Sequence, residues 1–287
     1  MKLSVIIPCY NAEDTIGDQL QALVEQQWSE PWEIIVVDNR CTDSSMSIVQ
    51  HYQSRLPNLR IVKAIERQGQ PYALNTGAKA AKGESLVFCD ADDAVGEGYV
   101  AAMGEALMHH ELVACGFDVE RLNADWVRRS HGNLQQAGLS QYKYPPYLPH
   151  SGGGALGVRR TLHQEMGGFD ETLPILHDTD FCWRLQLAGV ELHFVSDAVV
   201  HVRYRASLRG LYRQSRSYAE YNVLLYKRYR AKGMPPISWK MRAHSWTRFA
   251  KRVRHVRNRG DMARVVWLYG WHVGRARGSL KHRVLAL

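Results

Sequence analysis

The chain has 287 residues, of which 45% are hydrophobic and 23% are charged, with a formal net charge of +9. A chain of this length and composition can bury a substantial core, which argues against a disordered protein. No stretch approaches the roughly 18 consecutive apolar residues of a membrane-spanning helix, and the first residues lack the features of a signal peptide, so neither is expected.

The first 90 residues alternate short β-branched runs with amphipathic segments. Strands are predicted over residues 3–7, 33–37, 59–64 and 85–89, and helices over residues 12–27, 44–55 and 72–81. This alternation is typical of an α/β fold with a Rossmann-like, mainly parallel sheet flanked by helices. The acidic run Asp90-Ala91-Asp92-Asp93 directly follows the last of these strands. It is therefore expected at the carboxyl end of a strand, where open α/β sheets bind ligands.

The middle of the chain is less regular. Ser151 is followed by three glycines, which predicts a loop that passes close to another backbone or a ligand. We interpret this loop as a candidate contact for a substrate, with a flexible surface loop as the alternative. A helix over residues 178–188 and a strand over 191–195 follow. Long Arg-rich helices are predicted over residues 208–232 and 238–278, the second with a break near residue 260.

The charge is distributed very unevenly. Residues 203–287 contain 22 Lys and Arg against two acidic residues, a net charge of +20, whereas the first 202 residues carry a net charge of −11. We therefore predict a domain over residues 1–205 and a basic, aromatic-rich helical extension over residues 206–287. Basic amphipathic helices with aromatic side chains favour attachment to an anionic membrane surface. Binding to nucleic acid phosphates, packing on the first domain and dimerisation remain the alternatives.

Five cysteines are scattered along the chain without the paired spacing of a zinc site. Several of them lie in or beside apolar runs, which indicates buried, reduced thiols in a cytoplasmic protein.

The acidic run at residues 90–93 is a candidate metal site. Carboxylates on one turn can converge on a hard divalent cation such as Mg²⁺ or Mn²⁺, which also bridges phosphate oxygens. A solvated turn or a helix cap is the alternative, because an Asp-x-Asp pattern is short and frequent.

Five stretches of sequence together carry a family resemblance. In order they are VIIPCYNAE at 5–13, IIVVDNRCTDSS at 34–45, LNTGAKAAKGE at 74–84, FCDADD at 88–93, and GGFDE at 167–171 followed by HDTDFCWR at 177–184. Over about the first 205 residues the chain resembles the family-two glycosyltransferases. The resemblance implies a GT-A fold and inverting transfer of a sugar from a nucleotide-diphosphate donor.

The resemblance also implies roles for individual residues on the donor side. Donor binding is assigned to Pro8, Tyr10, Asn11, Asp38, Asp90 and Asp93, and metal binding principally to Asp92. Two departures from the family pattern occur. Asn39 stands where family members often have a second Asp, and Leu74 precedes Asn75 where they frequently have Arg.

The acceptor base is expected in a Glu-Asp pair, which here reads His177-Asp178. We predict Asp178 as the base, with Asp180 or a simple helix cap as alternatives. The resemblance further suggests that His201 makes a second metal or pyrophosphate contact, with a histidine that is simply hydrogen-bonded within the fold as the alternative. Arg203 is predicted to neutralise charge on the leaving group of the donor.

These features predict a metal-dependent inverting glycosyltransferase. Its acceptor would be a hydroxyl of a glycan or lipid-linked molecule in cell-envelope polysaccharide or glycolipid synthesis, and the enzyme would be peripheral on the inner face of the plasma membrane. A nucleotidyltransferase that makes activated sugars is one alternative, although residues 8–11 are not the glycine-rich phosphate loop expected of it. A nucleic-acid-binding protein is the other.

Overall fold

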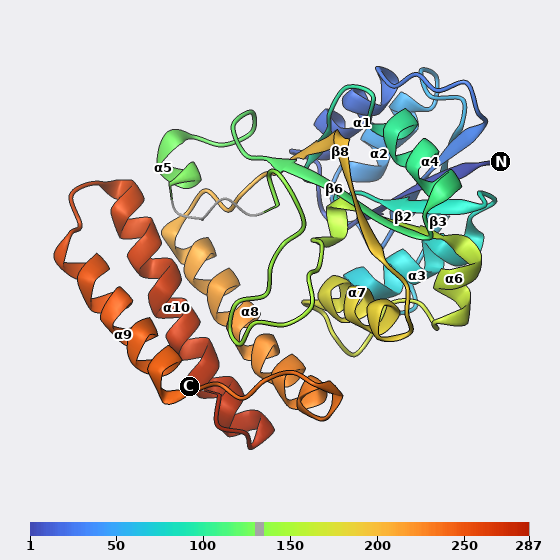
Figure 1. The fold of residues 1–287 in the computed structure, drawn as a ribbon. Coiled ribbons are helices and arrows are strands. Elements are labelled where there is room, and N and C mark those ends of the chain that lie inside the picture. The colour runs from blue at the N-terminus through green and yellow to red at the C-terminus, as the bar shows by residue number, and fades with distance from the viewer. Residues whose placement is uncertain (130–134, 287) are drawn as a thin grey trace. The chain divides into compact units, whose positions relative to one another are not determined.

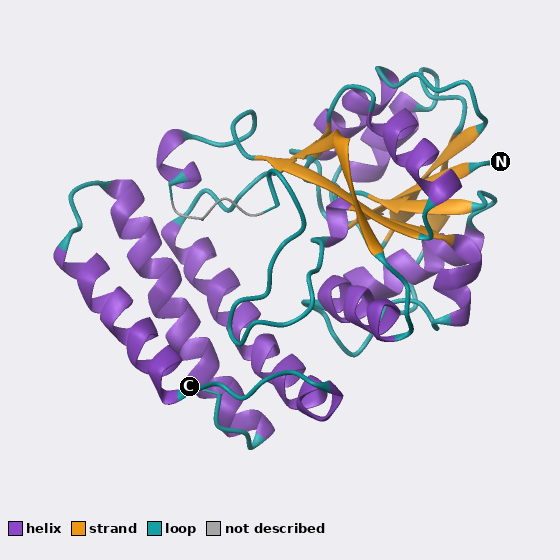
Figure 2. Ribbon diagram, in the orientation of Figure 1, coloured by secondary structure: helices purple, strands orange, loops and turns teal. Residues whose placement is uncertain are grey.

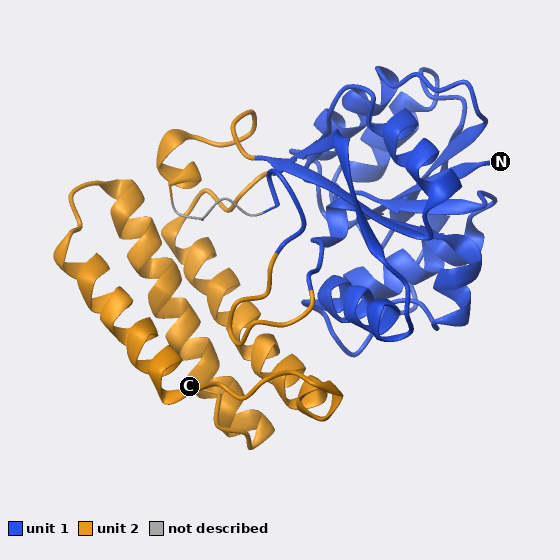
Figure 3. Ribbon diagram, in the orientation of Figure 1, with its two compact units in different colours: residues 1–118, 135–140, 149–202 blue, residues 119–134, 141–148, 203–287 orange. Residues whose placement is uncertain are grey.

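The computed structural model describes residues 1–129 and 135–286, which form two compact units (Figures 1 and 3). Unit 1 comprises Met1–Asp118, Gln135–Ser140 and Pro149–Val202, and unit 2 comprises Val119–Leu134, Gln141–Leu148 and Arg203–Leu287. The units therefore interleave along the chain, whereas the predicted division at residue 205 is a single cut.

Unit 1 is built on an eight-stranded sheet, drawn as orange arrows in Figure 2. The strands are β1 (Leu3–Cys9), β2 (Trp32–Asp38), β3 (Leu59–Lys63), β4 (Ser85–Phe88), β5 (Ala94–Val95), β6 (Leu112–Asp118), β7 (Leu156–Arg159) and β8 (Leu192–His201). Their order in the sheet is β3-β2-β1-β4-β7-β6-β8-β5. Strands β1 to β4 pair in parallel, while β7 runs antiparallel to both of its neighbours, β4 and β6.

Helices cover both faces of this sheet (Figure 1). They are α1 (Ile16–Val24), α2 (Ser45–Tyr52), α3 (Gln70–Ala80), α4 (Tyr99–His109), α6 (Arg160–Glu165) and α7 (His177–Leu187). Helices α1, α2 and α4 lie on one face, and α3, α6 and α7 lie on the other. Because both faces are covered, β1 and β2 are almost wholly buried, which explains their unbroken apolar runs. The predicted mainly parallel sheet flanked by helices is confirmed.

Strand β8 differs from its prediction. The sequence indicated a strand over residues 191–195, but β8 continues to His201 beyond exposed residues at 196 and 197. Its pairing with β6 shifts register between Cys115 and Gly116, and the strand then continues alongside β6 to Asp118. A bulge of this kind keeps a strand paired past an irregular stretch that breaks the apolar pattern.

Unit 2 is helical. It contains α5 (Asp125–Arg128), α8 (Leu208–Tyr229), the short 3-10 helix η2 (Arg230–Lys232), α9 (Trp239–Arg254) and α10 (Arg259–His282). The predicted break near residue 260 is present, since α10 begins after Asn258, whose side chain accepts a hydrogen bond from the Asp261 amide at 2.9 Å. Among the described residues, no helix is long and apolar enough to cross a bilayer.

Candidate active site

Three aspartates gather at the carboxyl end of β4. Asp90, Asp92 and Asp93 each offer a carboxylate oxygen, and these oxygens lie within 4.8 Å of one another. Asp93 is buried, while Asp90 and Asp92 are partly exposed. The Asp90 Oδ1 accepts a hydrogen bond from the Gln70 side chain at 2.7 Å, so helix α3 helps to orient this carboxylate.

The aspartate cluster fits a hard divalent cation. Mg²⁺ binds carboxylate oxygens at about 2.0–2.1 Å in octahedral geometry, and Mn²⁺ prefers similar oxygen ligands. Oxygens no more than 4.8 Å apart need only small side-chain rotations to share one such ion. The residues present therefore suit Mg²⁺ or Mn²⁺, and the geometry does not choose between the two.

A glycine turn joins this cluster to Asp178. The Gly153 amide donates a hydrogen bond to Asp178 Oδ2 at 2.8 Å. A Cβ atom on the next residue, Gly154, would lie 3.0 Å from Asp90 Oδ2 and 3.3 Å from Asp93 Oδ2. Adjacent residues of one turn therefore contact both Asp178 and the aspartate cluster. The structure thus brings the predicted base and the predicted metal ligands into one site.

The two acidic residues in the first turn of α7 have different surroundings. Asp180 is buried and pairs with Arg184, whose Nε lies 2.8 Å from Asp180 Oδ2. Arg184 also donates to the backbone carbonyls of Met166 and Gly168, so the pair fixes α7 to the preceding turn. Asp178 remains partly exposed beside the glycine turn. The geometry therefore favours Asp178 over Asp180 as a group that acts on a substrate.

The predicted donor-binding residues lie where β1 and β2 end. Pro8 is in β1, and Cys9 pairs with Asp38 across the two strands. Tyr10 is 51% exposed, and Asn11 adopts a left-handed backbone conformation with φ of 47°. The Asn11 Oδ1 accepts a hydrogen bond from the Thr42 amide at 2.8 Å, which ties the two strand ends together.

His201 lies at the end of β8, paired with Ala94, the residue after Asp93. Its Nδ1 is 2.5 Å from Asp118 Oδ2, an arrangement that holds the ring in one orientation. Among the described residues, however, the only group of three or more His, Cys, Asp or Glu side chains that could hold a metal ion is Asp90, Asp92 and Asp93, and His201 is not part of it. Arg203 belongs to unit 2, and its contact with the donor stays a prediction.

Comparison with known proteins identifies the family. The model described as glycosyl transferase family 2 matches residues 4–167, and one described as glycosyl transferase family group 2 matches residues 86–273. The chain belongs to glycosyl transferase family 2.

This family-2 chain is similar to a poly(ribitol-phosphate) β-glucosyltransferase of Bacillus spizizenii, with 42% identity over 98 residues. The match covers 33% of the chain and 16% of that relative, so the chain spans a small part of the relative's length. Among solved structures, it resembles a mannosyltransferase from Pyrobaculum calidifontis in complex with GDP-Man and Mn²⁺. That match has a TM-score of 0.59 and 19% identity over 96% of the chain and 73% of the other protein.

A second similar structure is residues 1–349 of TarS from S. aureus in complex with UDP-GlcNAc. The TM-score is 0.53, with 20% identity over 99% of the chain and 93% of that protein. At this level of identity the likeness shows the fold, which is the expected GT-A fold.

Two residues that support the candidate site were not predicted from sequence to do so. Asp118 orients His201 although the two are 83 positions apart, and no local pattern marks it. Asn39 is buried and its amide donates to the Ala64 and Arg67 carbonyls, while its oxygen accepts from the Gly69 amide. Asn39, at a position where the family often has Asp, therefore holds the loop between β3 and α3.

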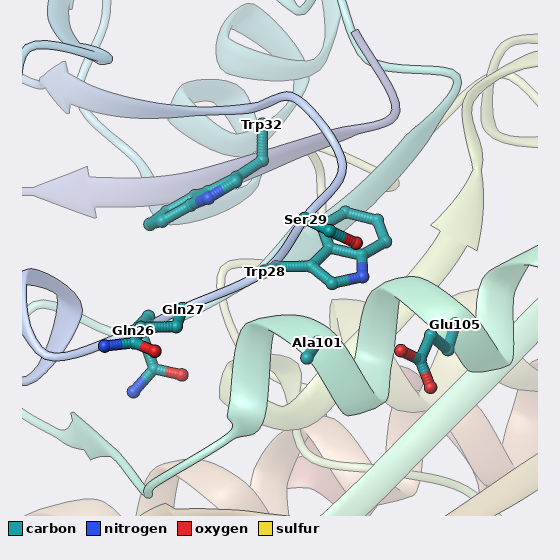
Figure 4. A pocket seen from close by; sticks show the side chains of 7 residues that line it. All are labelled: Gln26, Gln27, Trp28, Ser29, Trp32, Ala101 and Glu105. Carbon is teal, nitrogen blue, oxygen red and sulfur yellow. The ribbon is translucent and has the colours of Figure 1, made fainter.

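A separate open pocket of about 570 Å³ lies beside α4 (Figure 4). It is lined by Gln26, Gln27, Trp28, Ser29, Trp32, Ala101 and Glu105. The Trp28 ring packs on Gly104, where a Cβ atom would lie 2.4 Å from the ring. None of the predicted site residues lines this pocket, so we do not assign it to the active site.

Proposed function

We propose that this protein is an inverting, metal-dependent glycosyltransferase. It transfers a sugar from a nucleotide-diphosphate sugar to a hydroxyl of a glycan or lipid-linked acceptor, in cell-envelope polysaccharide or glycolipid synthesis. The observation that carries the proposal is the glycine turn, in which Gly153 bonds Asp178 and Gly154 lies against Asp90 and Asp93. This turn holds a candidate base and a candidate cation site together, as sugar transfer requires.

The chemistry follows from these positions. The Asp178 carboxylate takes the proton from the acceptor hydroxyl while the hydroxyl oxygen forms a bond to the anomeric carbon. The bond between that carbon and the diphosphate breaks on the opposite face, so the configuration inverts. A Mg²⁺ or Mn²⁺ ion held by Asp92, with Asp90 and Asp93 supporting, would supply positive charge for the departing diphosphate.

In this proposal the donor nucleotide binds at the ends of β1 and β2. Pro8, Tyr10 and Asn11 face the nucleotide in this proposal, and Asp38 binds the base. His201 and Arg203 add contacts to the ion or the diphosphate. The relatives support a nucleotide-sugar donor, because similar structures contain GDP-Man with Mn²⁺ and UDP-GlcNAc. The name of the Bacillus relative supports a polymeric acceptor.

Release of nucleoside diphosphate from UDP-, GDP- and dTDP-sugars tests the metal site. We expect turnover that requires Mn²⁺ or Mg²⁺ and is abolished by a chelator. Asp92→Ala should reduce turnover by roughly 100-fold or more, because such an ion stabilises transition-state charge by several kcal/mol. Asp197→Ala, at an exposed aspartate of β8, is the matched control. Turnover that survives both chelation and Asp92→Ala would contradict the proposal.

Asp178→Asn tests the base. The amide cannot accept the proton, so turnover should fall by about 10²–10⁴-fold. Nucleotide affinity, measured by calorimetry, should stay close to that of the wild type because the shape of the side chain is kept. Full turnover in this variant would show that another group is the base.

We also propose that the protein acts in the cytoplasm, attached peripherally to the inner face of the plasma membrane. The net charge of +20 over residues 203–287, together with the aromatic residues of this segment, supports attraction to anionic lipid.

A further inference from the structure

Helix α9 is unusual in unit 2 because none of its 16 residues is buried. One side of the helix packs on α10. The Trp246 ring stacks on His272 with centroids 4.1 Å apart, and the Phe249 ring contacts His272 edge-on at 5.5 Å. The rest of the helix surface is open to solvent.

The exposed surface, to which Trp246 contributes the part of its ring that α10 leaves uncovered, carries a continuous row of apolar side chains that we call the apolar stripe. It consists of Trp239, Ala243, Trp246, Ala250 and Val253. At 100° per residue, these positions fall within a sector of about 80° around the helix axis. Trp239 is 72% exposed, Trp246 54% and Val253 48%. Apolar side chains aligned in this way mark an interaction surface, whereas single exposed ones do not.

A row of cations borders the apolar stripe on the solvent side. This basic edge consists of Lys240, Lys251 and Arg254, which are all exposed and lie within a sector of about 60° next to the stripe. Helix α9 contains no acidic residue that could neutralise the edge. The exposed side of α9 therefore carries aromatic and aliphatic side chains along the apolar stripe and cations along the adjacent basic edge.

The apolar stripe and the basic edge together determine which partner fits the exposed side of α9 best. A helix lying in a membrane interface places Trp and aliphatic side chains at the boundary between headgroups and acyl chains, with Lys and Arg against anionic headgroups. A second copy of the chain would bring a net positive surface against another, which is unfavourable. A nucleic acid would satisfy the cations but would leave Val253 and the alanines of the stripe without apolar partners.

We propose that α9 is the membrane-contacting element of this protein and lies along a bilayer that contains anionic lipid. The apolar stripe enters the interface and the basic edge contacts the headgroups. This inference rests on the membrane attachment in the proposed function and assigns that attachment to one helix face.

Flotation of the full-length protein with vesicles tests the assignment. The vesicles are phosphatidylcholine alone or phosphatidylcholine mixed with phosphatidylglycerol. The wild type should float with the mixed vesicles, much less with the neutral ones, and less as salt is raised. Two double variants target the face: Trp239→Ser with Val253→Ser, and Lys240→Glu with Lys251→Glu. Each should lower partitioning by about tenfold or more.

Matched controls are available in the same unit. Leu280→Ser removes an apolar side chain on α10 that is 82% exposed but lies outside the stripe. Arg209→Glu with Arg213→Glu reverses two exposed charges on α8. These controls should keep most of the wild-type partitioning. Equal losses of vesicle binding in the controls and in the α9 variants would overturn the assignment. The overall charge and apolar content of unit 2 would then explain the binding.

Other outcomes would also overturn the proposal. They are a wild type that does not float, a stripe-dependent dimer in light scattering without flotation, and salt-sensitive binding to duplex DNA without flotation. Turnover of nucleotide sugars, measured without vesicles, separates the two proposals. A protein that turns over donor but does not float leaves sugar transfer standing and removes the α9 assignment. A protein that floats but turns over no donor leaves the α9 assignment standing and contradicts the proposed sugar transfer.

Discussion

His177 occupies the position where the family resemblance implies Glu, and its surroundings explain why a neutral ring suits it. The side chain is 4% exposed and lies edge-on to Phe169, with centroids 5.4 Å apart. Both ring nitrogens are buried, and neither makes a hydrogen bond of ordinary geometry to the described residues. Burial lowers the pKa of the imidazole, so the ring is neutral near pH 7.

We predict that His177→Glu destabilises the protein by about 3–5 kcal/mol at pH 8, because it buries a carboxylate without a cation beside Asp178 and Asp180. Burial would raise the pKa of the new carboxyl group, so it is protonated and better tolerated at low pH. His177→Gln is the control, because Gln has the shape of Glu but carries no charge. Melting temperatures should show a gap between the two variants that widens from pH 5 to pH 8. Equal melting temperatures of the Glu and Gln variants at pH 8 would contradict the prediction. They would mean that the new carboxylate is hydrogen-bonded, ion-paired or hydrated.

The sequence predicted those site residues that sit in short, ordered motifs. The aspartates at 90–93 and Asp178 follow directly from strand and helix positions, and the structure places them around one glycine turn. Asp118 and Asn39 could not be predicted in the same way. Their roles depend on contacts with His201 and with Ala64, residues that are distant in sequence and become neighbours only in the folded sheet.

At the level of elements, strands with unbroken apolar runs were predictable. Strands β1 and β2 are buried on both faces, so nearly every residue in them is apolar. Strand β7 is different, because it has only four residues and no pattern that reports its antiparallel direction. Its place between β4 and β6 is set by tertiary pairing, which local sequence does not encode.

Helices α8 and α10 owe their close approach to glycine. On α10, Gly270, Gly274 and Gly278 recur every four residues and face α8. A Cβ atom on Gly274 would lie 2.1 Å from the Arg216 carbonyl oxygen, which is shorter than any real contact of this kind. The two backbones are therefore packed directly against each other.

We predict that Gly274→Ala lowers the stability of the protein by about 1–3 kcal/mol, because the added methyl group must push the helices apart. Gly17→Ala, in α1, is the control, because a Cβ atom there would meet nothing within 4 Å. Alanine favours a helix over glycine by about 1 kcal/mol, so this control should be neutral or stabilising. Thermal unfolding measures both. A Gly274→Ala protein as stable as the control would show that α8 and α10 pack less closely.

For the whole molecule, the main consequence is that unit 2 is not a simple C-terminal tail. Its segment before residue 149 contacts the late helices at several points. The Arg259 guanidinium lies 3.9 Å from the Trp126 ring centroid, and the Arg275 guanidinium lies 3.8 Å from that of Tyr144. The Tyr142 hydroxyl is 2.5 Å from the Asn222 side-chain oxygen. Charge asymmetry indicated where the basic helices start, but it carried no information about these earlier partners.

We therefore predict that removing residues 206–287 does more than remove a membrane anchor. The truncated chain loses the partners of Trp126, Tyr142 and Tyr144, so these aromatic side chains become exposed and their backbone loosens. Limited trypsin digestion should then cut at Arg129 and Lys143 much faster than in the full-length protein. The full-length variant Trp239→Ser with Val253→Ser is the control and should resist cleavage like the wild type, because it changes only exposed side chains of α9. If the truncated chain were equally resistant at both sites, residues 119–129 and 141–148 would be held independently of the helices. Truncation would then test membrane attachment as specifically as the point variants do.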